Sequence, residues 1–402
     1  MKNNIKLSLF LIILFSLIFA GGCNFSEEST PLTKSEINSQ QSISEGGFLS
    51  EPESVVSSIP VTEPAVTTEE QTTVPDPLDE KALRFLSRMS LEEKIGQVIL
   101  CRYADNAGEL QGKYHFGGYT LYAKDFQNET ENSIKEKKTV LSELSLIAPF
   151  IAADEEGGSV VRISKFSQFS ESPLPPLKEG AKNISEFAAK MADILKKGGV
   201  NLNLAPVADT AENEYDYIYD RTCGLGWEET GDVISELVSE LKGRGIMCCL
   251  KHFPGYGSNV DTHTGIAVDN RTENDFITKD FIPFKKGIEA GAPMVMVNHN
   301  IVTAYNGTVP ASLAPEVHKA LRELGFDGII VTDDLGMGAI AEYSKDPYAD
   351  AFLAGNDLLC TSDGIACYNA LMKGITSGKI SKNRLDESVF RILRAKISYG
   401  IQ

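Results

Sequence analysis

Residues 251–265 hold the densest group of side chains in this sequence that could do chemistry. The stretch opens on Lys251 and His252, passes through a Pro/Gly-rich turn, and closes on the titratable pair Asp261 and His263. A short apolar run directly precedes it and predicts a buried strand. A buried strand that ends in charged side chains and a glycine-bearing loop is typical of an active site. We therefore take this stretch as a candidate catalytic segment.

The pair Asp261 and His263 has the chemistry of a general acid/base. A neighbouring carboxylate can orient an imidazole and raise its pKa, so that the ring donates and accepts protons near neutral pH. The same spacing also occurs in surface loops without catalytic function. A metal site that combines these two side chains with His252 is a further alternative, since no other residues in the sequence have metal-ligand spacing.

Asp333 is a second candidate catalytic group. It follows a near-continuous apolar run at residues 328–331, so its carboxylate is expected at the end of another buried strand. A carboxylate in that place can act as a nucleophile, a base or a metal ligand. The alternative is a cap for a helix that begins near Leu335, a role for which Asp334 is the more natural residue.

Arg162 and Arg221 are the other notable cations. Arg162 follows an acidic run that begins at Asp154, and Arg221 directly follows Asp220. Because buried arginines are nearly always paired, each of these two could be a salt-bridge partner within the fold instead of a ligand contact.

The body of the sequence alternates short apolar runs with longer amphipathic ones. We expect strands at residues 96–101, 118–122, 150–153, 200–205, 247–250, 294–297, 328–332 and 358–360. We expect helices at residues 131–145, 184–197, 230–244, 281–290, 314–323 and 381–399. Strands that alternate with helices form parallel sheets. Eight of them in about 320 residues favour an α/β fold with a single (β/α)8 TIM-type barrel over an open doubly wound sheet.

A (β/α)8 barrel predicts that polar residues just after the strands gather at one end, the catalytic face. The sequence has many polar residues at such places: Asp154, Glu155, Glu156, Asp209, Lys251, His252, Asn298, His299, Asp333 and Asp334.

The N-terminal residues predict that the protein is exported from the cytoplasm. Two lysines precede an apolar stretch, and a small-residue site leads directly into Cys23. Residues 1–22 therefore resemble a bacterial lipoprotein signal peptide, with Cys23 as the lipidated first residue that anchors the protein to the outer face of the cell membrane. Ordinary secretion or an uncleaved anchor is the alternative. Residues 23–77 are rich in Ser, Thr, Glu and Pro and predict a disordered acidic tether before a domain at residues 78–402.

Charge and cysteine placement exclude other classes. The net charge of −18 argues against a nucleic-acid partner, which needs a basic face. The seven cysteines are irregularly spaced and include no Cys-x-x-Cys pair, so neither a disulfide framework nor a structural zinc site is expected. We expect Cys248, Cys249 and Cys360 to be small core residues.

A series of motifs runs in order through residues 83–401. They are Met89-Ser90-Leu91-Glu92-Glu93-Lys94-Ile95-Gly96-Gln97, Asp154-Glu155-Glu156-Gly157-Gly158, Asn201-Leu202-Asn203-Leu204-Ala205-Pro206-Val207-Ala208-Asp209, Lys251-His252-Phe253-Pro254-Gly255, Asp261-Thr262-His263, the stretch 282–296, and Val331-Thr332-Asp333-Asp334-Leu335-Gly336-Met337. Together these motifs resemble the single-domain bacterial β-N-acetylglucosaminidases of glycoside hydrolase family 3.

The resemblance implies a (β/α)8 barrel and a retaining mechanism through a covalent glycosyl-enzyme. It implies that Asp333 is the nucleophile, that His263 is the acid/base, and that Asp261 tunes His263. It also implies a set of contacts to the sugar hydroxyl and acetamido groups, namely Asp154, Arg162, Arg221, Lys251 and His252. It implies no metal and no organic cofactor.

The activity implied by the resemblance is exo-acting hydrolysis of terminal β-linked N-acetylglucosamine from peptidoglycan-derived sugars, with muropeptides or wall glycans as substrates. Alternatives are a β-glycoside phosphorylase or other β-glycosidase of the same family, and a surface sugar-binding lipoprotein without catalysis. The sequence departs from the family pattern at Glu155, Cys223, Tyr256 and Ser258, where glutamine, phenylalanine, histidine and aspartate are usual.

Overall fold

The computed structural model describes residues 76–259, 267–336 and 340–402. An eight-stranded parallel sheet forms its centre, in the order β10-β1-β2-β3-β4-β5-β7-β9. The strands are β1 (Ile99–Arg102), β2 (Gly118–Thr120), β3 (Phe150–Ala153), β4 (Leu202–Asn203), β5 (Met247–Phe253), β7 (Met294–Val297), β9 (Ile329–Thr332) and β10 (Leu359–Thr361). Backbone N–H groups of Thr332 and Leu358 donate to the carbonyls of Leu358 and Ile330 at 3.2 and 3.1 Å, which joins the two end strands. The predicted (β/α)8 barrel is therefore confirmed.

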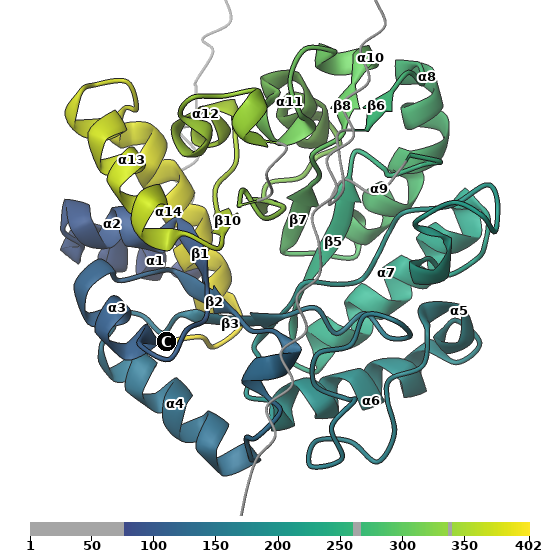
Figure 1. The fold of residues 1–402 in the computed structure, drawn as a ribbon, viewed down its shortest axis with the longest axis horizontal. Helices are drawn as coiled ribbons and strands as arrows, with labels where there is room; N and C mark the ends of the chain where they lie inside the picture. The colour runs from purple at the N-terminus through teal and green to yellow at the C-terminus, as the bar shows by residue number, and fades with distance from the viewer. Residues whose placement is uncertain (1–75, 260–266, 337–339) are drawn as a thin grey trace, which may run out of the picture. The chain divides into compact units, whose positions relative to one another are not determined.

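Helices lie around the outside of the sheet (Figure 1). The longer ones are α1 (Pro77–Arg88), α2 (Leu91–Gln97), α3 (Ala107–Tyr114), α4 (Glu131–Glu143), α6 (Ile184–Lys197), α7 (Trp227–Gly243), α9 (Phe281–Glu289), α11 (Pro315–Glu323), α12 (Pro347–Ala354), α13 (Gly364–Thr376) and α14 (Lys382–Ser398). Short helices are α5 (Leu177–Gly180), α8 (Glu273–Asp275) and α10 (Thr303–Asn306). A separate parallel ribbon pairs β6 (Val268–Asp269) with β8 (Ile301–Val302).

The strands predicted at 150–153 and 294–297 and the helix predicted at 184–197 have the predicted bounds. The strand predicted at 96–101 begins later, at Ile99, because the residues up to Gln97 belong to α2. Gly96 packs this helix against the backbone that leads into β2, where an added Cβ would lie 2.1 Å from the carbonyl oxygen of Tyr114. An apolar run that contains a glycine can thus end a helix as well as begin a strand.

Helices α1, α3, α12 and α13 were not predicted from the sequence. Helix α1 buries only Ala82 and Leu86, although its N-cap Asp76 and Pro77 at its first position are helix-start signals. It is held by docking against α14, where Arg394 Nε donates to Asp79 Oδ1 at 2.6 Å. Tertiary packing supplies most of the stability of such a helix.

Strand β5 extends to Phe253, three residues beyond its predicted end. The chain that follows β4 continues beside it, so that the Cys249 N–H donates to the Ala205 carbonyl at 2.9 Å and Val207 pairs with Lys251. This extension places Lys251 and His252 inside a buried strand and not in a loop after it.

Candidate active site

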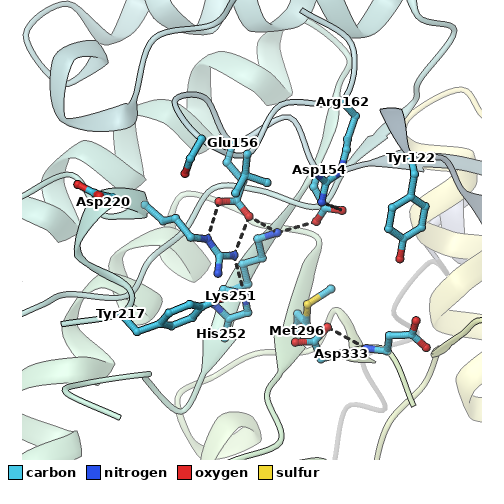
Figure 2. Close-up of a pocket in the computed structure, with 14 residues that line it drawn as sticks. Tyr122, Asp154, Glu156, Arg162, Tyr217, Asp220, Lys251, His252, Met296 and Asp333 are labelled. Carbon is cyan, nitrogen blue, oxygen red and sulfur yellow. Dashed lines mark hydrogen bonds and ion pairs between the residues drawn. The ribbon is translucent and has the colours of Figure 1, made fainter. Parts of the chain in front are cut away.

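A cavity of about 590 Å³ opens at the carboxyl ends of the strands, a size usual for a ligand site. Six predicted site residues line it: Asp154, Arg162, Arg221, Lys251, His252 and Asp333 (Figure 2). The structure therefore brings together in one cavity every predicted site residue that lies within the described ranges. Asp261 and His263 lie outside the described residues, as does Cys23.

Lys251 is the centre of a buried ion-pair network. Its Nζ donates to Asp154 Oδ1 at 2.7 Å and lies 2.6 Å from Glu156 Oε1. Glu156 in turn accepts two hydrogen bonds from Arg221, from Nε at 2.9 Å and from Nη2 at 2.8 Å. The side chains of Lys251 and Glu156 are each only 3% exposed. Two cations and two anions thus alternate along one wall of the cavity (Figure 2).

The network keeps its members charged. Burial alone would raise the pKa of Glu156, but Lys251 and Arg221 outweigh it and lower this pKa to about 2. Burial opposes the charge of Lys251 as well, yet Asp154 and Glu156 raise its pKa above the usual value. Glu156 follows β3 and was named among the polar residues of the catalytic face, but sequence reasoning did not include it among the ligand contacts.

The adjacent Glu155 has a different role. Glu155 is not among the residues that line the cavity, and its carboxylate accepts hydrogen bonds from the backbone N–H groups of Arg162, Ile163 and Ser164 at 2.8, 2.8 and 3.2 Å. It thereby shapes the connection that carries Arg162. The guanidinium of Arg162 lies 3.7 Å from Asp154 Oδ2 and 5.5 Å from the ring centre of Tyr122, which also lines the cavity.

His252 has a protein partner at each ring nitrogen. Nδ1 lies 2.7 Å from Asp209 Oδ2, and Nε2 lies 3.2 Å from Arg221 Nη2. Asp209 is buried and follows β4, where the sequence placed it on the catalytic face without a role. The ring of Tyr256, at the position where the family usually has a histidine, lies edge-on to His252 with 5.7 Å between ring centres.

Asp333 directly follows β9, and its N–H donates to the Val297 carbonyl of β7 at 3.0 Å. Its Oδ1 accepts from the Asp334 N–H at 2.8 Å. Burial alone would raise the pKa of Asp333, but His299, His252, the Asp334 N–H and Lys251 together lower it, so the carboxylate is ionised at neutral pH. An ionised carboxylate at the mouth of the cavity can act as a nucleophile or stabilise a developing cation.

The alternative role of Asp333 or Asp334 is to cap a helix near Leu335, and residues 337–339, where that helix would continue, lie outside the described residues. Residues 335–336 form a turn, in which Asp334 Oδ1 accepts from the N–H of Gly336 at 2.8 Å and from that of Ser362 at 3.1 Å. His299 Nε2 lies 3.2 Å from the Asp334 carbonyl, so it steadies the same turn.

The cysteines in the described part of the chain are buried free thiols. Cys248, Cys249 and Cys360 lie on β5 and β10 and are confirmed as small core residues. Cys223, where the family usually has phenylalanine, is buried with its Sγ 3.1 Å from Thr230 Oγ1.

Residues 76–259, 267–336 and 340–402 contain no group of three or more His, Cys, Asp or Glu side chains that could hold a metal ion. Within the same ranges, no helix is long and apolar enough to cross a membrane. The alternative metal site with His252 depends on Asp261 and His263, which are not described.

Comparison with known proteins identifies the family. Residues 90–395 match the family model "Glycosyl hydrolase family 3 N terminal domain". Beta-hexosaminidase A of Pseudoalteromonas piscicida is 27% identical over 72% of this chain and 54% of its own length, and the Xylella fastidiosa beta-hexosaminidase is 32% identical over 56% and 68%. The solved glycoside hydrolase family 3 β-N-acetylglucosaminidase of a Paenibacillus species superposes with a TM-score of 0.71, at 26% identity, over 78% of this chain and 63% of that one.

The chain thus spans about half the length of the first of these relatives and about two thirds of the other two. The matched region contains all six predicted site residues that line the cavity. Because the family model covers most of the sequence, the chain belongs to glycosyl hydrolase family 3.

Proposed function

We propose that this protein is an exo-acting, retaining β-N-acetylhexosaminidase that hydrolyses terminal β-linked N-acetylglucosamine. The observation that carries the proposal is the shared cavity of the ionised Asp333 carboxylate and the network of Asp154, Lys251, Glu156 and Arg221. Relatives in the same family that bear the name β-hexosaminidase support the choice of sugar.

In the proposed reaction Asp333 attacks the anomeric carbon as the bond to the leaving oxygen breaks, which gives a covalent glycosyl-enzyme. His263 donates a proton to the leaving oxygen and then takes one from the water that releases the sugar, while Asp261 orients the ring. Asp154, Arg162, Lys251, His252 and Arg221 are the proposed contacts to the sugar. The charges of Asp154, Arg162, Lys251 and Arg221 are already in place before the transition state forms, so these side chains hold the sugar ring in position for attack.

Described residues on both sides of the Asp261–His263 segment support this arrangement. Asn259 Nδ2 donates to Asp269 Oδ2 at 2.7 Å, so the chain enters and leaves residues 260–266 at one place. That place adjoins the cavity, because the Tyr256 carbonyl accepts from the same Asn259 amide at 2.8 Å and the Tyr256 ring packs on His252.

Release of chromophore from an aryl β-N-acetylglucosaminide tests the activity. Asp333→Asn is expected to abolish turnover, and His263→Ala to reduce it strongly. Asp327→Asn is the matched control, since Asp327 precedes the same strand at its opposite end and its side chain is 87% exposed. Full activity of Asp333→Asn would overturn the assignment of the nucleophile.

Two further measurements separate the competing functions. Phosphate added to the assay yields glycosyl phosphate if the enzyme is a phosphorylase and leaves free N-acetylglucosamine as the product if it is a hydrolase. Wild-type protein that binds N-acetylglucosamine in calorimetry and never turns over a glycoside would be a sugar-binding protein.

We also propose a lipid anchor at Cys23 on the outer face of a bacterial cell membrane, with wall-derived glycans or muropeptides as substrates. The proposal rests on the apolar stretch and small-residue site before Cys23 and on the acidic tether that would let the barrel reach the wall. Partition of the mature protein into the membrane fraction, lost in Cys23→Ser, is the expected result. A wholly soluble mature form would contradict it.

A further inference from the structure

Asp209 lies beside the end of β5, next to the proposed sugar contacts Lys251 and His252. The course of the backbone after β4 places it there. Beyond the end of β4, the chain stays beside β5, and the Ala208 N–H donates to the Lys251 carbonyl at 2.7 Å. The next residue, Asp209, therefore meets the residue that follows Lys251. Its side chain is fully buried against His252.

The Asp209 carboxylate accepts three hydrogen bonds. Oδ2 accepts from the backbone N–H of His252 at 2.9 Å and from its ring Nδ1 at 2.7 Å. Oδ1 accepts from the backbone N–H of Tyr256 at 2.7 Å, at the start of the chain that leads to residues 260–266. One carboxylate thus joins the end of β5 to the residue four positions further on.

The partners of the His252 ring determine its tautomer. Arg221 has only donor groups, so the Nε2 that faces Arg221 Nη2 at 3.2 Å must accept. The proton of the neutral ring then lies on Nδ1 and is donated to Asp209. A ring with its proton on Nε2 would direct an N–H against the guanidinium and would push Arg221 away from its place in the cavity.

We propose that Asp209 is a positioning residue that sets the tautomer and orientation of His252 and, through this ring, the position of Arg221. The contacts form one continuous series, Asp209 to His252, His252 to Arg221, Arg221 to Glu156, and Glu156 to Lys251. The effect on catalysis rests on the proposed function, in which Arg221 and Lys251 contact the sugar.

The same contacts distinguish this role from simple structural support. Glu155 is an equally buried carboxylate, and within the described part of the chain its hydrogen bonds come from three backbone N–H groups and not from the side chains that line the cavity. Glu155→Gln therefore removes a buried charge of the same kind without touching the His252 ring, and it is the matched control for Asp209→Asn.

The first experiment determines which ring nitrogen of His252 carries the proton. Nitrogen-15 NMR of the ligand-free protein, which has five histidines, is expected to show a neutral His252 with its proton on Nδ1. The signal is assigned by its absence in His252→Gln. Asp209→Ala is expected to move the proton to Nε2 or to mix the two tautomers, and Glu155→Gln is expected to leave it in place. A proton on Nε2 in the wild-type protein overturns the proposal.

The second experiment is a double-mutant cycle between Asp209 and Arg221. Asp209→Ala and Arg221→Ala are each expected to lower kcat/KM for the aryl β-N-acetylglucosaminide about 10- to 100-fold, largely through KM, since each loses one charge-assisted contact. The double variant should lose little more than either single one, because both act through one contact series. Full additivity, or an unchanged KM with only a lower melting temperature as in Glu155→Gln, would overturn the proposal.

A second variant and the NMR measurement keep the role of Asp209 testable if Asp209→Ala does not fold or if the protein is inactive. If Asp209→Ala does not fold, Asp209→Asn keeps the volume but can satisfy His252 and Tyr256 only in part, and the same cycle is run with it. If wild-type protein hydrolyses no hexosaminide, the proposed function fails, while the NMR experiment still decides the role of Asp209 in orienting the ring.

Discussion

Lys251 Nζ lies 2.6 Å from Glu156 Oε1, and both side chains are almost wholly removed from solvent. Glu156 follows β3 and Lys251 lies on β5, so the two residues are far apart in the sequence, yet their charges neutralise each other at the cavity wall. A buried ion pair contributes modest net stability when complete, and breaking it by removal of one partner is costly.

Glu156→Gln is expected to lower the free energy of unfolding by about 3 kcal/mol near neutral pH, because it leaves Lys251 and Arg221 without their shared anion. Activity should fall as well, since both cations shift. Urea unfolding and the aryl-glycoside assay measure the two effects. Glu240→Gln breaks a half-exposed pair with Arg244 and should change stability by no more than about 0.5 kcal/mol. Equal effects of the two substitutions would contradict this interpretation.

The lowered pKa of Glu156 also predicts acid sensitivity. A carboxyl group whose pKa falls from 4.5 to about 2 on folding contributes stability above pH 4.5, and this contribution is lost as the pH falls toward 2. The shift corresponds to roughly 3 kcal/mol. The difference in unfolding free energy between wild type and Glu156→Gln should therefore shrink between pH 5 and about pH 2. A difference that stays constant over this window would rule out the linkage.

Lys396 predicts a second rise of stability with pH, in the alkaline range. Its side chain is wholly buried on α14, Nζ donates to Gln97 Oε1 at 2.8 Å, and burial lowers its pKa from 10.5 to about 7. Between these two values the unfolded chain binds more protons than the folded one, so stability rises with pH. Lys396→Met is expected to be about 2 kcal/mol more stable near pH 7, after the loss of the Gln97 contact, and to lack this rise. Lys382→Met, an exposed lysine on the same helix, is the control and should keep the wild-type slope.

Asn300 has a buried side-chain amide without hydrogen-bond partners among the described residues. It is 0% exposed, and among the described residues neither its Oδ1 nor its Nδ2 has a hydrogen-bond partner. Asn300→Leu has nearly the same shape and is expected to raise the unfolding free energy by about 1–3 kcal/mol. Asn356→Leu is the contrast, because the Asn356 amide donates to the Ser312 and Ala351 carbonyls and its loss should destabilise. The melting temperatures of the two variants test this prediction. A destabilised Asn300→Leu would contradict it and would mean that the amide has a hydrogen-bond partner in solution.

Gly96 predicts a steric effect on folding. A Cβ at this position would lie 2.1 Å from the Tyr114 carbonyl oxygen and 2.4 Å from that of His115, both backbone atoms that cannot move aside. Gly96→Ala is expected to cost about 3 kcal/mol. Gly243→Ala, at the end of α7 with nothing within 4 Å of an added Cβ, should be neutral or stabilising by up to about 1 kcal/mol. Denaturant midpoints of the two variants compare them directly.

The sequence by itself determined the strands that lie at the centre of the barrel and the identity of most cavity residues. Runs such as residues 294–297 are short and apolar throughout, as is typical of a strand buried on both faces. Asp154, Lys251 and Asp333 could be located because a polar residue directly after such a run must lie at the mouth of the barrel. Asp76 and Pro77 signal the start of helix α1, but its docking against α14, more than three hundred residues away along the chain, could not be predicted.

Only the tertiary structure decided what neighbouring residues of one motif do. Glu155 and Glu156 are chemically alike and adjacent, yet one binds the backbone of residues 162–164 and the other pairs with Lys251 and Arg221. Asp209 is similar, because its contact with His252 depends on how far the chain after β4 runs beside β5. Side-chain type and spacing determine which groups reach the cavity, whereas the path of the backbone determines which of them meet, and that path is set by packing between distant segments.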